Sequence, residues 1–508
     1  MLAIFDHGDP APCPHPFNLA SHVLRHAQDL PAKVALSVIS QDGADDWSYA
    51  RLSAAVRGTG AGLLAAGFRP GDILLMRLGN TVDFPLAYLG AIAVGLVPVP
   101  TSSQLTAPEV TKMVAQLSPA GILRDTRVAC PEDTGLPVID TAALAAMRDL
   151  APAPYDLGAP DRRAYIIYTS GTSGVPRAVM HAHRAIWARQ MMHQGWYGLT
   201  ATDRLLHAGA FNWTYTLGTG LMDPWSVGAT ALIPAEGVAI EALPQLLADH
   251  GATIFAAAPG VYRKILSHHA KMHLPALRHG LAAGEKLSDR VRQHWTDATG
   301  TPIFEAYGMS ECSTFISGSP DHPASPGTLG RPQDGRRVAI LGADGPVKLG
   351  EEGTIAVART DPGLMLGYLG APEDTAARMQ GDWFLTGDQG MMDAEGQITY
   401  LGRADDMMNA GGYRVSPLEV EAALLAHPAI REVGVTDIEV KEDARIIAAF
   451  YVGDPADDAE LKAFANERLA RYKQPRVYIR LDALPSGANG KILRRALKPL
   501  YEARHGQA

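Results

Sequence analysis

The segment 168–177, YTSGTSGVPR, has the residue types of a phosphate-binding loop. It follows a β-type run at 164–168 and then contains almost only hydroxyl residues and glycine. Glycines let successive backbone N–H groups point into one concavity, hydroxyls add donors, and Arg177 adds a positive charge. No Gly-Lys-Ser/Thr ends the segment, so it differs from the common nucleotide loop. Taken alone, it is also compatible with an ordinary Ser/Thr/Gly surface turn.

Strand and helix patterns alternate on both sides of this loop. Short apolar runs typical of strands stand at 34–39, 72–76, 97–99, 228–233, 253–257 and 302–306. Longer runs typical of helices stand between them at 49–66, 84–95, 183–194, 243–250 and 291–299. This alternation predicts an α/β fold with a doubly wound, largely parallel sheet. A loop at the end of such a strand lies where open α/β sheets bind their ligands.

The pattern changes after about residue 325. Residues 327–402 contain short alternating runs between turns, which predicts a small antiparallel barrel or sheet. From residue 403 the runs are again mixed, with helices expected at 417–427 and 459–469 and strands at 430–435 and 446–451. We therefore expect an N-terminal domain at 1–402 and a separate C-terminal α+β domain at 403–508.

Composition excludes several classes of protein. A chain of 508 residues is too long for one hydrophobic core, and 47% hydrophobic with 19% charged residues is ordinary for a globular protein. A net charge of −9 argues against nonspecific binding to nucleic acid or anionic membranes. The cysteines at 13, 130 and 312 are far apart and form no CxxC, which argues against disulfides and structural zinc.

Two stretches of the sequence bear on the location of the protein. The first residues, MLAIFDHGDPAPCPHP, lack the basic start of a secretory signal. The longest apolar run, 84–100, is interrupted by glycines and prolines, so we interpret it as a helix followed by a buried strand rather than a membrane span. We expect a cytoplasmic protein.

Five further motifs follow the loop in a fixed order: AGEKL at 283–287, YGMSE at 307–311, TGD at 386–388, GRADDMMNAGGYRVSPLEVE at 402–421 and LPSGANGKILRRAL at 484–497. With the loop, they resemble the adenylate-forming superfamily of acyl- and aryl-CoA synthetases, luciferases and peptide-synthetase adenylation domains. The resemblance covers nearly the whole chain. It implies a large N-terminal domain of doubly wound sheets with a small β-barrel-like subdomain, and a small mobile C-terminal α+β domain.

The resemblance also implies a reaction. An acid's carboxylate attacks the α-phosphate of ATP, pyrophosphate leaves, and the thiol of coenzyme A then attacks the acyl-AMP. Such a site brings two anions together, so it works mostly through positioning and electrostatics. The implied protein is an ATP-dependent carboxylic acid–CoA ligase that uses ATP, Mg²⁺ and coenzyme A. Its implied catalytic residues are Lys491, Glu311 and Arg177.

The nucleotide-binding residues follow from the same motifs. The phosphate loop would hold the β- and γ-phosphates through Thr169, Ser170, Gly171, Thr172, Ser173 and Gly174. The AMP moiety would lie against Gly284, Glu285, Tyr307, Gly308, Met309, Ser310, Asp388 and Arg403. Tyr307 would stack on adenine, Asp388 would accept from the ribose hydroxyls and Glu311 would hold Mg²⁺.

The C-terminal motifs imply a conformational step. Asp405 stands at the family's hinge position, where rotation would exchange two faces of the small domain. One face would present Lys491 for adenylation. The other would present the coenzyme A-binding loop, formed by Gly411, Gly412, Tyr413 and Arg414.

Three departures from the family pattern stand out. The phosphate loop usually ends Pro-Lys-Gly but here reads Pro176-Arg177-Ala178, which keeps the charge and changes its geometry. Ser310 replaces the usual threonine and keeps the hydroxyl. Asn409 stands where a lysine is common.

The identity of the acid is less constrained. Acetate-specific relatives commonly carry a tryptophan at the position of Gly308, so we expect a pocket open to an acid larger than acetate. Phe211, Trp213 and Tyr215 either narrow this pocket or pack in the core. Residues 207–222 contain no carboxylate for an amino acid's ammonium group, which leaves a short- or medium-chain aliphatic acid or an aryl acid.

Two other functions remain open on the sequence. The acyl group could pass to a carrier protein instead of coenzyme A, although the chain contains no carrier domain. Arg177 also leaves open a noncatalytic nucleotide- or acyl-CoA-binding protein, against which the intact Lys491, Glu311 and Asp388 argue. The expected partners are small molecules and not nucleic acid, and a homodimer is left open.

Overall fold

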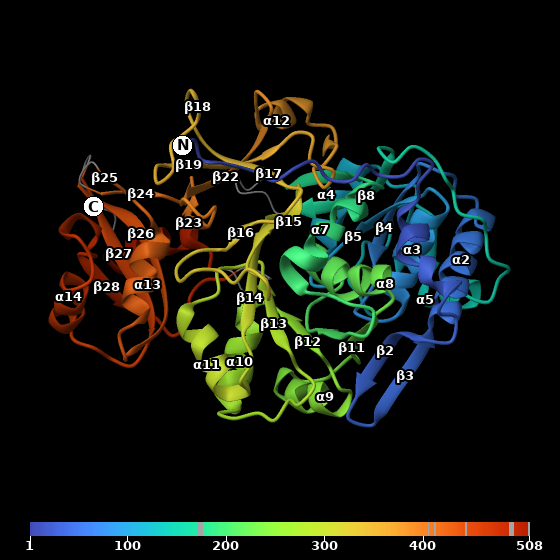
Figure 1. Cartoon of the computed structure of the whole chain (residues 1–508), viewed down its shortest axis with the longest axis horizontal. Coiled ribbons are helices and arrows are strands. Elements are labelled where there is room, and N and C mark those ends of the chain that lie inside the picture. Colours follow the sequence, from blue (N-terminus) through green and yellow to red (C-terminus); the bar gives the residue numbers. More distant parts are fainter. Residues whose placement is uncertain (170–175, 405, 411–412, 442–443, 487–491, 506–508) are drawn as a thin grey trace. The chain divides into compact units, whose positions relative to one another are not determined.

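The computed structural model describes the chain except residues 170–175, 405, 411–412, 442–443, 487–491 and 506–508 (Figure 1). It divides into two compact units. The larger comprises residues 5–338 and 357–384, and the smaller comprises 1–4, 339–356 and 385–508. The smaller unit thus takes in 385–402 as well as the segment that we expected from residue 403 onward.

A nine-stranded sheet dominates the larger unit. Its strand order is β16-β15-β14-β13-β12-β10-β11-β2-β3. The strands are β2 (Val34–Ser40), β3 (Gly43–Ser48), β10 (Arg204–His207), β11 (Thr230–Pro234), β12 (Ile254–Ala257), β13 (His279–Ala283), β14 (Ile303–Met309), β15 (Ser313–Ser317) and β16 (Arg331–Pro332). Every neighbouring pair from β2 to β14 is parallel, and β3, β15 and β16 add antiparallel edges. The predicted α/β fold class is confirmed.

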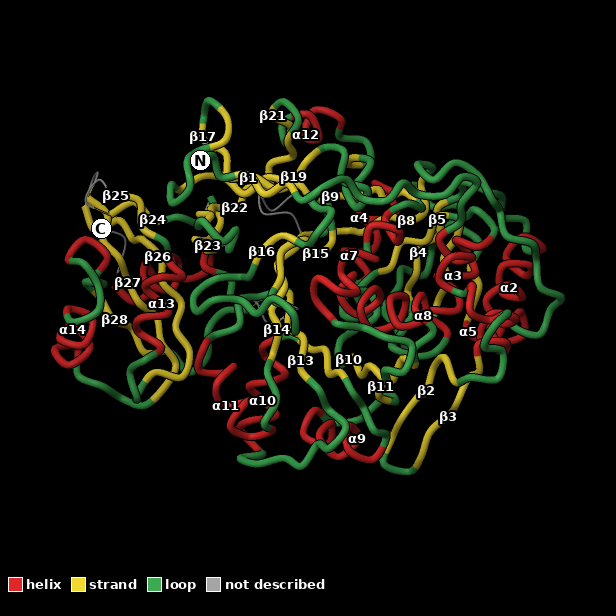
Figure 2. Tube along the Cα trace, viewed as in Figure 1, coloured by secondary structure: helices red, strands yellow, loops and turns green. Residues whose placement is uncertain are grey.

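Helices cover this sheet with apolar faces. The tube view shows α9 (Leu243–Asp249), α10 (Pro259–His268) and α11 (Asp289–Thr299) beside β12, β13 and β14 (Figure 2). Their buried residues, including Leu246, Tyr262 and Trp295, form one core cluster with Phe255 of β12. Ser288 caps α11, because its side chain accepts from the Val291 amide. The connecting segments include η4 (Ile240–Ala242), η3 (Thr216–Met222) and α8 (Asp223–Val227).

A second, four-stranded parallel sheet has the order β5-β4-β6-β7. It consists of β4 (Ile73–Arg77), β5 (Val97–Pro100), β6 (Gly121–Arg124) and β7 (Val138–Asp140), with α1 (Leu19–Val23), η1 (Arg25–Ala27), α2 (Tyr49–Ala65), α3 (Asp83–Ala93), α4 (Ala107–Leu117) and α5 (Thr141–Met147). From Phe84 to Ala93, α3 is buried on all sides, which explains its apolar sequence. Among the described residues, no helix is long and apolar enough to cross a membrane.

The phosphate-loop motif lies in a different setting from the one expected. It connects β8 (Arg163–Thr169) to β9 (Arg177–Ala182), and these strands pair antiparallel, with Thr169 opposite Arg177. Residues 177–182 pair as a strand because their backbone can bond both to β8 and to β20 (Gly367–Tyr368). The expectation of a loop at the end of a parallel-sheet strand is therefore wrong. The helix expected at 183–194 is also broken, into α6 (Ala185–Ala188), α7 (Gln190–Met192) and the π-turn η2 (His193–Tyr197).

The expected antiparallel sheet after residue 325 is present. Its order includes β17-β19-β22, with β18 paired to β17 and β23 to β22. The elements of this region are β1 (Ile4–Asp6), β17 (Arg337–Gly342), β18 (Gly345–Pro346), β19 (Glu352–Ala358), α12 (Pro372–Ala376), β21 (Met379–Gln380), β22 (Trp383–Met392) and β23 (Ile398–Arg403).

The C-terminal part of the smaller unit is the predicted α+β structure. A three-stranded sheet has the order β26-β27-β28, with its long pair antiparallel. The elements are β24 (Met408–Ala410), β25 (Tyr413–Val415), α13 (Pro417–Leu425), β26 (Ile430–Lys441), β27 (Ala444–Gly453), α14 (Asp458–Asn466), η5 (Arg471–Lys473), β28 (Val477–Arg480), η6 (Arg494–Ala496) and α15 (Leu497–His505). Val420, Val435 and Ile447 belong to its own hydrophobic core.

Candidate active site

The YGMSE motif lies at a strand pair at the edge of the nine-stranded sheet. β14 extends through Met309 and returns as β15, with Gly308 opposite Thr314. A side chain at Gly308 would overlap the Ser313 carbonyl oxygen, so the backbones can pair this closely only at glycine. Ser313 has φ of 62°, which is unusual for a residue other than glycine. The space next to Gly308 is thus filled by β15, and the glycine is not in itself a sign of an open acid pocket.

Glu311 is held by a neighbouring tyrosine. The Tyr368 Oη donates to Glu311 Oε1 at 2.7 Å, and the Met365 amide donates to the Glu311 carbonyl at 2.7 Å. Burial first, and the Glu311 carboxylate second, raise the pKa of Tyr368, so the phenol keeps its proton and remains a donor. Tyr368 lies on β20, which pairs with β9. The carboxylate is therefore oriented from β20, which is paired with the strand that follows the phosphate-loop motif.

Magnesium fits this single carboxylate. In the described part of the chain no group of three or more His, Cys, Asp or Glu could hold a metal ion. Mg²⁺ needs no such cage, because it binds through one or two carboxylates and takes its other ligands from phosphates and water. Glu311 would hold the ion, which would supply charge neutralisation at the phosphates when bound.

His181 connects the YGMSE motif to β9. Burial lowers the pKa of His181 to about 4, so its ring is neutral and donates from Nε2 to the Ser310 carbonyl at 2.7 Å. The ring also stacks on Tyr165 with 4.8 Å between centroids. His181 and His183 are both buried. Their spacing of two along an apolar strand was the available signal that both side chains face inward.

Arg177, the departure from the family pattern, forms an ion pair. Its Nη2 lies 2.7 Å from Asp374 Oδ2, and both side chains are partly exposed. Asp374, which lies on α12, was not singled out from the sequence. An exposed pair of this kind contributes about 0–1 kcal/mol, so Arg177 can leave it for a phosphate at small cost.

The AGEKL turn follows β13. Gly284 has φ of +96°, and a β-carbon there would lie 3.2 Å from the ring of Trp213. Glu285 Oε1 accepts from the Gly260 amide at 3.1 Å and lies 3.6 Å from Arg263 Nη2. The first turn of α10 therefore fixes the Glu285 side chain, and Trp213 covers the turn itself.

Asp388 and Arg403 meet in the smaller unit. They are Cα partners on β22 and β23, with 3.8 Å between Asp388 Oδ1 and Arg403 Nη1. The Asp388 amide donates to Thr386 Oγ1 at 3.1 Å, and the Tyr400 Oη donates to Asp388 Oδ1 at 3.4 Å. Asp388 is 6% exposed. The motifs TGD and GRADD thus converge on one ion pair.

Several predicted site residues fall outside the part of the chain that the structure describes. Those outside the described residues are Ser170, Gly171, Thr172, Ser173, Gly174, Asp405, Gly411, Gly412 and Lys491. The side chains of Tyr413 and Arg414 are also not described.

The three aromatics assigned to the acid pocket have different roles. Phe211 is buried against Phe84, with 5.9 Å between ring centroids. Tyr215 is buried and donates to the Leu281 carbonyl at 2.9 Å. Trp213 is partly exposed and adjoins Gly284. Phe211 and Tyr215 are therefore packed in the core, and Trp213 is the one of the three that adjoins the AGEKL turn.

A buried ion pair lies behind this segment. Arg189 donates from Nε to Asp223 Oδ1 at 2.8 Å and from Nη2 to Oδ2 at 2.5 Å. The Tyr197 Oη donates to Asp223 Oδ2 at 2.7 Å, and Arg189 Nη1 donates to Ser313 Oγ at 2.5 Å. The pair thus joins α8 to the start of β15. No motif in the sequence marked it.

Glu305 makes stability depend on pH. Burial raises the pKa of Glu305 from 4.5 to about 7, against the opposing effects of the Leu287 amide and Arg292. Because the pKa of Glu305 is higher in the folded than in the unfolded state, its contribution to the stability of the folded state is fully present below pH 4.5. This contribution is lost as the pH rises through about 7. We expect the melting temperature of Glu305→Gln, minus that of the wild type, to increase between pH 4.5 and 7. A difference that stays constant in melts across this range would contradict the assignment.

Comparison with known proteins agrees with this geometry. Residues 23–369 match the AMP-binding enzyme family, and 419–491 match the AMP-binding enzyme C-terminal domain. The benzoate–CoA ligase of Thauera aromatica is 29% identical, with 98% of this chain and 99% of the relative covered. The 3-hydroxybenzoate–CoA ligase of Aromatoleum sp. (strain CIB) is 29% identical, with 91% and 93% covered. A benzoate CoA ligase structure from Burkholderia xenovorans LB400 superposes with a TM-score of 0.85 at 28% identity, covering 95% and 100%.

The fold and the site define an AMP-forming acid–CoA ligase, which uses ATP, Mg²⁺ and coenzyme A. The match to the AMP-binding enzyme family extends over residues 23–369, which is about two thirds of the chain. The chain belongs to the AMP-binding enzyme family.

Proposed function

We propose that the protein ligates an aryl acid to coenzyme A through an aryl-AMP intermediate. The observation that carries this choice is the position of Trp213, a partly exposed indole directly beside Gly284 of the nucleotide-binding turn. A flat ring gains about 0.5–1.5 kcal/mol from an aromatic partner beyond its buried area. The relatives named for benzoate and 3-hydroxybenzoate support the same class of acid.

The site residues have the following proposed roles. Thr169, Arg177 and the loop between them bind the ATP phosphates, and Glu311 holds Mg²⁺ beside them. Tyr307 and the turn at Gly284 bind adenine. Asp388 binds the ribose hydroxyls, since a buried carboxylate that is positioned by a hydrogen bond from the Tyr400 hydroxyl is a fixed acceptor for a diol.

The C-terminal segment supplies the remaining chemistry in this proposal. Lys491 stabilises the charge that develops when the acid attacks the α-phosphate. Asp405 is the hinge between a domain at 1–402 and a domain at 403–508. Gly411, Gly412, Tyr413 and Arg414 admit the pantetheine arm. Their support is the order and spacing of the motifs in the sequence.

We further propose a cytoplasmic location. Cys13, Cys130 and Cys312 are free thiols. Unpaired cysteines are typical of a reducing compartment, where ATP and coenzyme A are also supplied.

The test is pyrophosphate release with benzoate, 3-hydroxybenzoate, butyrate, hexanoate and acetate, each with and without coenzyme A. We expect turnover that depends on coenzyme A, with kcat/KM for benzoate or 3-hydroxybenzoate exceeding that of the aliphatic acids at least about tenfold, or 1.4 kcal/mol. Greater activity on hexanoate would replace the aryl acid with an aliphatic one. Bound ATP with no pyrophosphate from any acid would favour a noncatalytic protein, and transfer to a carrier alone would exclude the CoA ligase.

The variant Trp213→Leu tests the aryl preference in the same assay. Loss of the aromatic partner should reduce the ratio of aryl to aliphatic kcat/KM by roughly threefold to tenfold. Trp187→Leu is the matched control, because this indole is also partly exposed but donates to the Ala11 carbonyl, away from Gly284. An unchanged ratio in Trp213→Leu would remove the basis for the aryl preference.

A further inference from the structure

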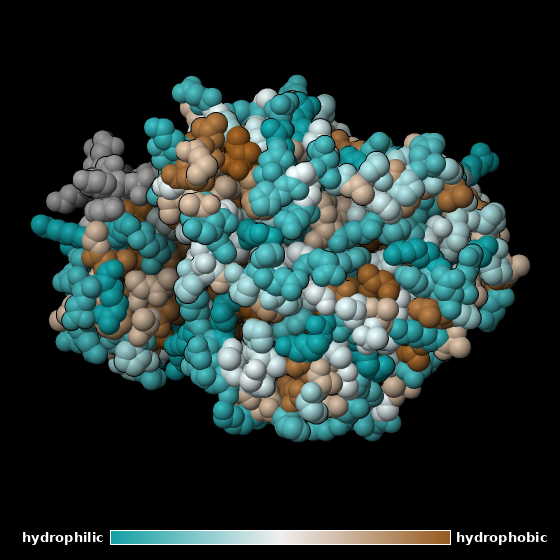
Figure 3. Space-filling view, viewed as in Figure 1, coloured by the Kyte–Doolittle hydropathy of each residue, from teal (hydrophilic) through white to brown (hydrophobic). Residues whose placement is uncertain are grey.

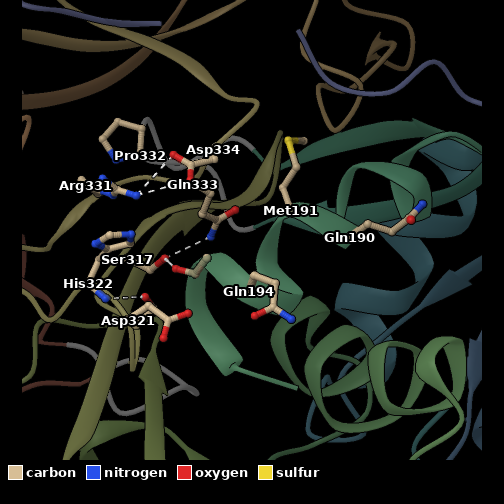
Figure 4. A pocket seen from close by; sticks show the side chains of 12 residues that line it. Gln190, Met191, Gln194, Ser317, Asp321, His322, Arg331, Pro332, Gln333 and Asp334 are labelled. Atoms are coloured by element: carbon tan, nitrogen blue, oxygen red, sulfur yellow. Dashed lines mark hydrogen bonds and ion pairs between the residues drawn. The ribbon is translucent and has the colours of Figure 1, made fainter. Parts of the chain in front are cut away.

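A cavity of about 200 Å³ opens on the larger unit, apart from the motifs described above. Its walls come from α7, η2, the end of β15, the loop that follows β15, β16 and the segment after β16 (Figure 4). The described residues that line it are Gln190, Met191, Gln194, Gly195, Ser317, Ser319, Asp321, His322, Arg331, Pro332, Gln333 and Asp334. None of them belongs to the ATP, acid or coenzyme A sites proposed above.

Gln333 is a buried polar side chain in the wall of this cavity. It is 2% exposed, and its Cβ and Cγ lie where a side chain at Gly195 would need to be, so glycine is required there for Gln333 to pack. Its Nε2 donates to Ser317 Oγ at 3.2 Å. Because the Ser317 hydroxyl gives its proton to the Gly195 carbonyl at 2.7 Å, Ser317 must accept from Gln333. The two ends of the amide are therefore not interchangeable.

The Gln333 Oε1 is consequently a fixed acceptor. Among the described residues it has no hydrogen-bond partner, although the atom is buried. In Figure 4 it points away from Ser317, toward the side of the cavity where Met191 lies. A buried acceptor without a donor costs about 1–3 kcal/mol. A ligand that brings an N–H or O–H donor would remove this cost.

The charged groups of the wall favour a cation. Arg331 Nη2 lies 3.3 Å from Asp334 Oδ2, so one positive group is already matched by one carboxylate. Asp321 adds a second, exposed carboxylate to the lining. Met191 and Pro332 give the wall an apolar part, against which a short hydrocarbon chain can pack. Donor, positive charge and short apolar chain together describe an alkylammonium or alkylguanidinium ion.

We propose that this cavity binds a small alkylammonium or alkylguanidinium compound, with its N–H group on Gln333 Oε1 and its charge near Asp321. The volume is below the roughly 300–1,000 Å³ of pockets for drug-sized ligands, so the occupant is a small metabolite. The surface view shows mostly hydrophilic residues on the visible face, with separate hydrophobic patches between them (Figure 3).

The test measures binding to the full chain by calorimetry and ligand-observed NMR, at fixed ionic strength. The probes are n-butylammonium and n-butylguanidinium chloride, compared with n-butanol and n-butanesulfonate, which share the chain but not the charge. We expect both cations to bind at least tenfold more tightly than the alcohol, and the sulfonate not to bind. Catalysis is not the readout, so the result is independent of the proposed ligase activity.

Variants then assign the contact. Gln333→Met keeps the shape and removes the acceptor, and should weaken cation binding at least tenfold. Asp321→Asn, on the exposed rim, should weaken it at least threefold without affecting folding. Gln293→Met on the exposed face of α11 is the matched control and should leave binding unchanged.

Three results would overturn the proposal. The first is that the alcohol binds as tightly as the cations. The second is that both Gln333→Met and Asp321→Asn leave cation binding intact. The third is that no probe binds, in which case water alone satisfies Gln333. Equal melting curves of the variants and the wild type by circular dichroism exclude unfolding as the cause of a loss.

Discussion

Replacing Lys491 with alanine is expected to lower the rate of pyrophosphate release by roughly 10²–10³-fold, the usual effect of removing one preorganised charge-stabilising group. The ammonium is assigned to the negative charge that develops as the acid attacks, which exists only in the transition state. Its loss should therefore reduce kcat far more than it weakens ATP binding. We expect the ATP dissociation constant to change no more than about threefold, which is below 1 kcal/mol.

The experiment pairs pyrophosphate release with ATP titration by calorimetry. Lys462→Ala is the control, because this lysine is exposed on α14 in the same unit. It should leave both quantities unchanged. Equal losses of ATP affinity and rate in Lys491→Ala would mean that the lysine binds the ground state and would exclude the assigned role.

Replacing Asp223 with alanine is expected to destabilise the larger unit by about 3–5 kcal/mol. Asp223 is 0% exposed and Arg189 is 6% exposed, so removal of the carboxylate leaves a guanidinium that water cannot reach. The Tyr197 hydroxyl loses its acceptor at the same time. The Arg189 guanidinium also packs directly against Gly218, where a side chain would overlap it.

Urea unfolding followed by tryptophan fluorescence measures this effect, since Trp196 and Trp225 lie in the same unit. Glu236→Ala is the control: it breaks the pair with Arg127, whose side chains are 60% and 56% exposed. Such a pair is worth about 0–1 kcal/mol. If the free energy of unfolding fell by the same amount in both variants, the buried pair of Asp223 and Arg189 would contribute no more to stability than an exposed pair, contrary to the geometry.

The larger elements of the fold could be predicted from sequence because their apolar periodicity is strong. The helix expected at 49–66 is α2, and the strand expected at 34–39 is β2. Residues 177–182 were missed because the strand is short and follows a glycine-rich loop, and its pairing with β8 and β20 is a tertiary fact. The break of 183–194 into α6, α7 and η2 was missed for a similar reason, since the Trp196 indole donates across to the Phe304 carbonyl.

The candidate site was predicted in part. Motif order brought Asp388 and Arg403 to attention, and the structure places them opposite each other. The residues that hold the motifs were not found. Tyr368, which donates to Glu311, lies 57 positions after it in the sequence. Asp374, which pairs with Arg177, lies 197 positions after it. No local sequence pattern predicts contacts over such separations. The sequence could not decide whether Phe211 and Tyr215 line a pocket or pack in the core, because their neighbours in sequence are compatible with both; in the structure both side chains are buried.

The close approach of β15 to Gly308 limits how the acid preference of this enzyme can be engineered. A mutant library that varied residue 308 to reshape the acid site would mostly contain disrupted sheet edges, since even alanine overlaps the Ser313 carbonyl. Selection from such a library would recover glycine and appear to prove its role in specificity. Diversity is better introduced at Trp213, a partly exposed side chain that no strand pairing constrains within the described structure.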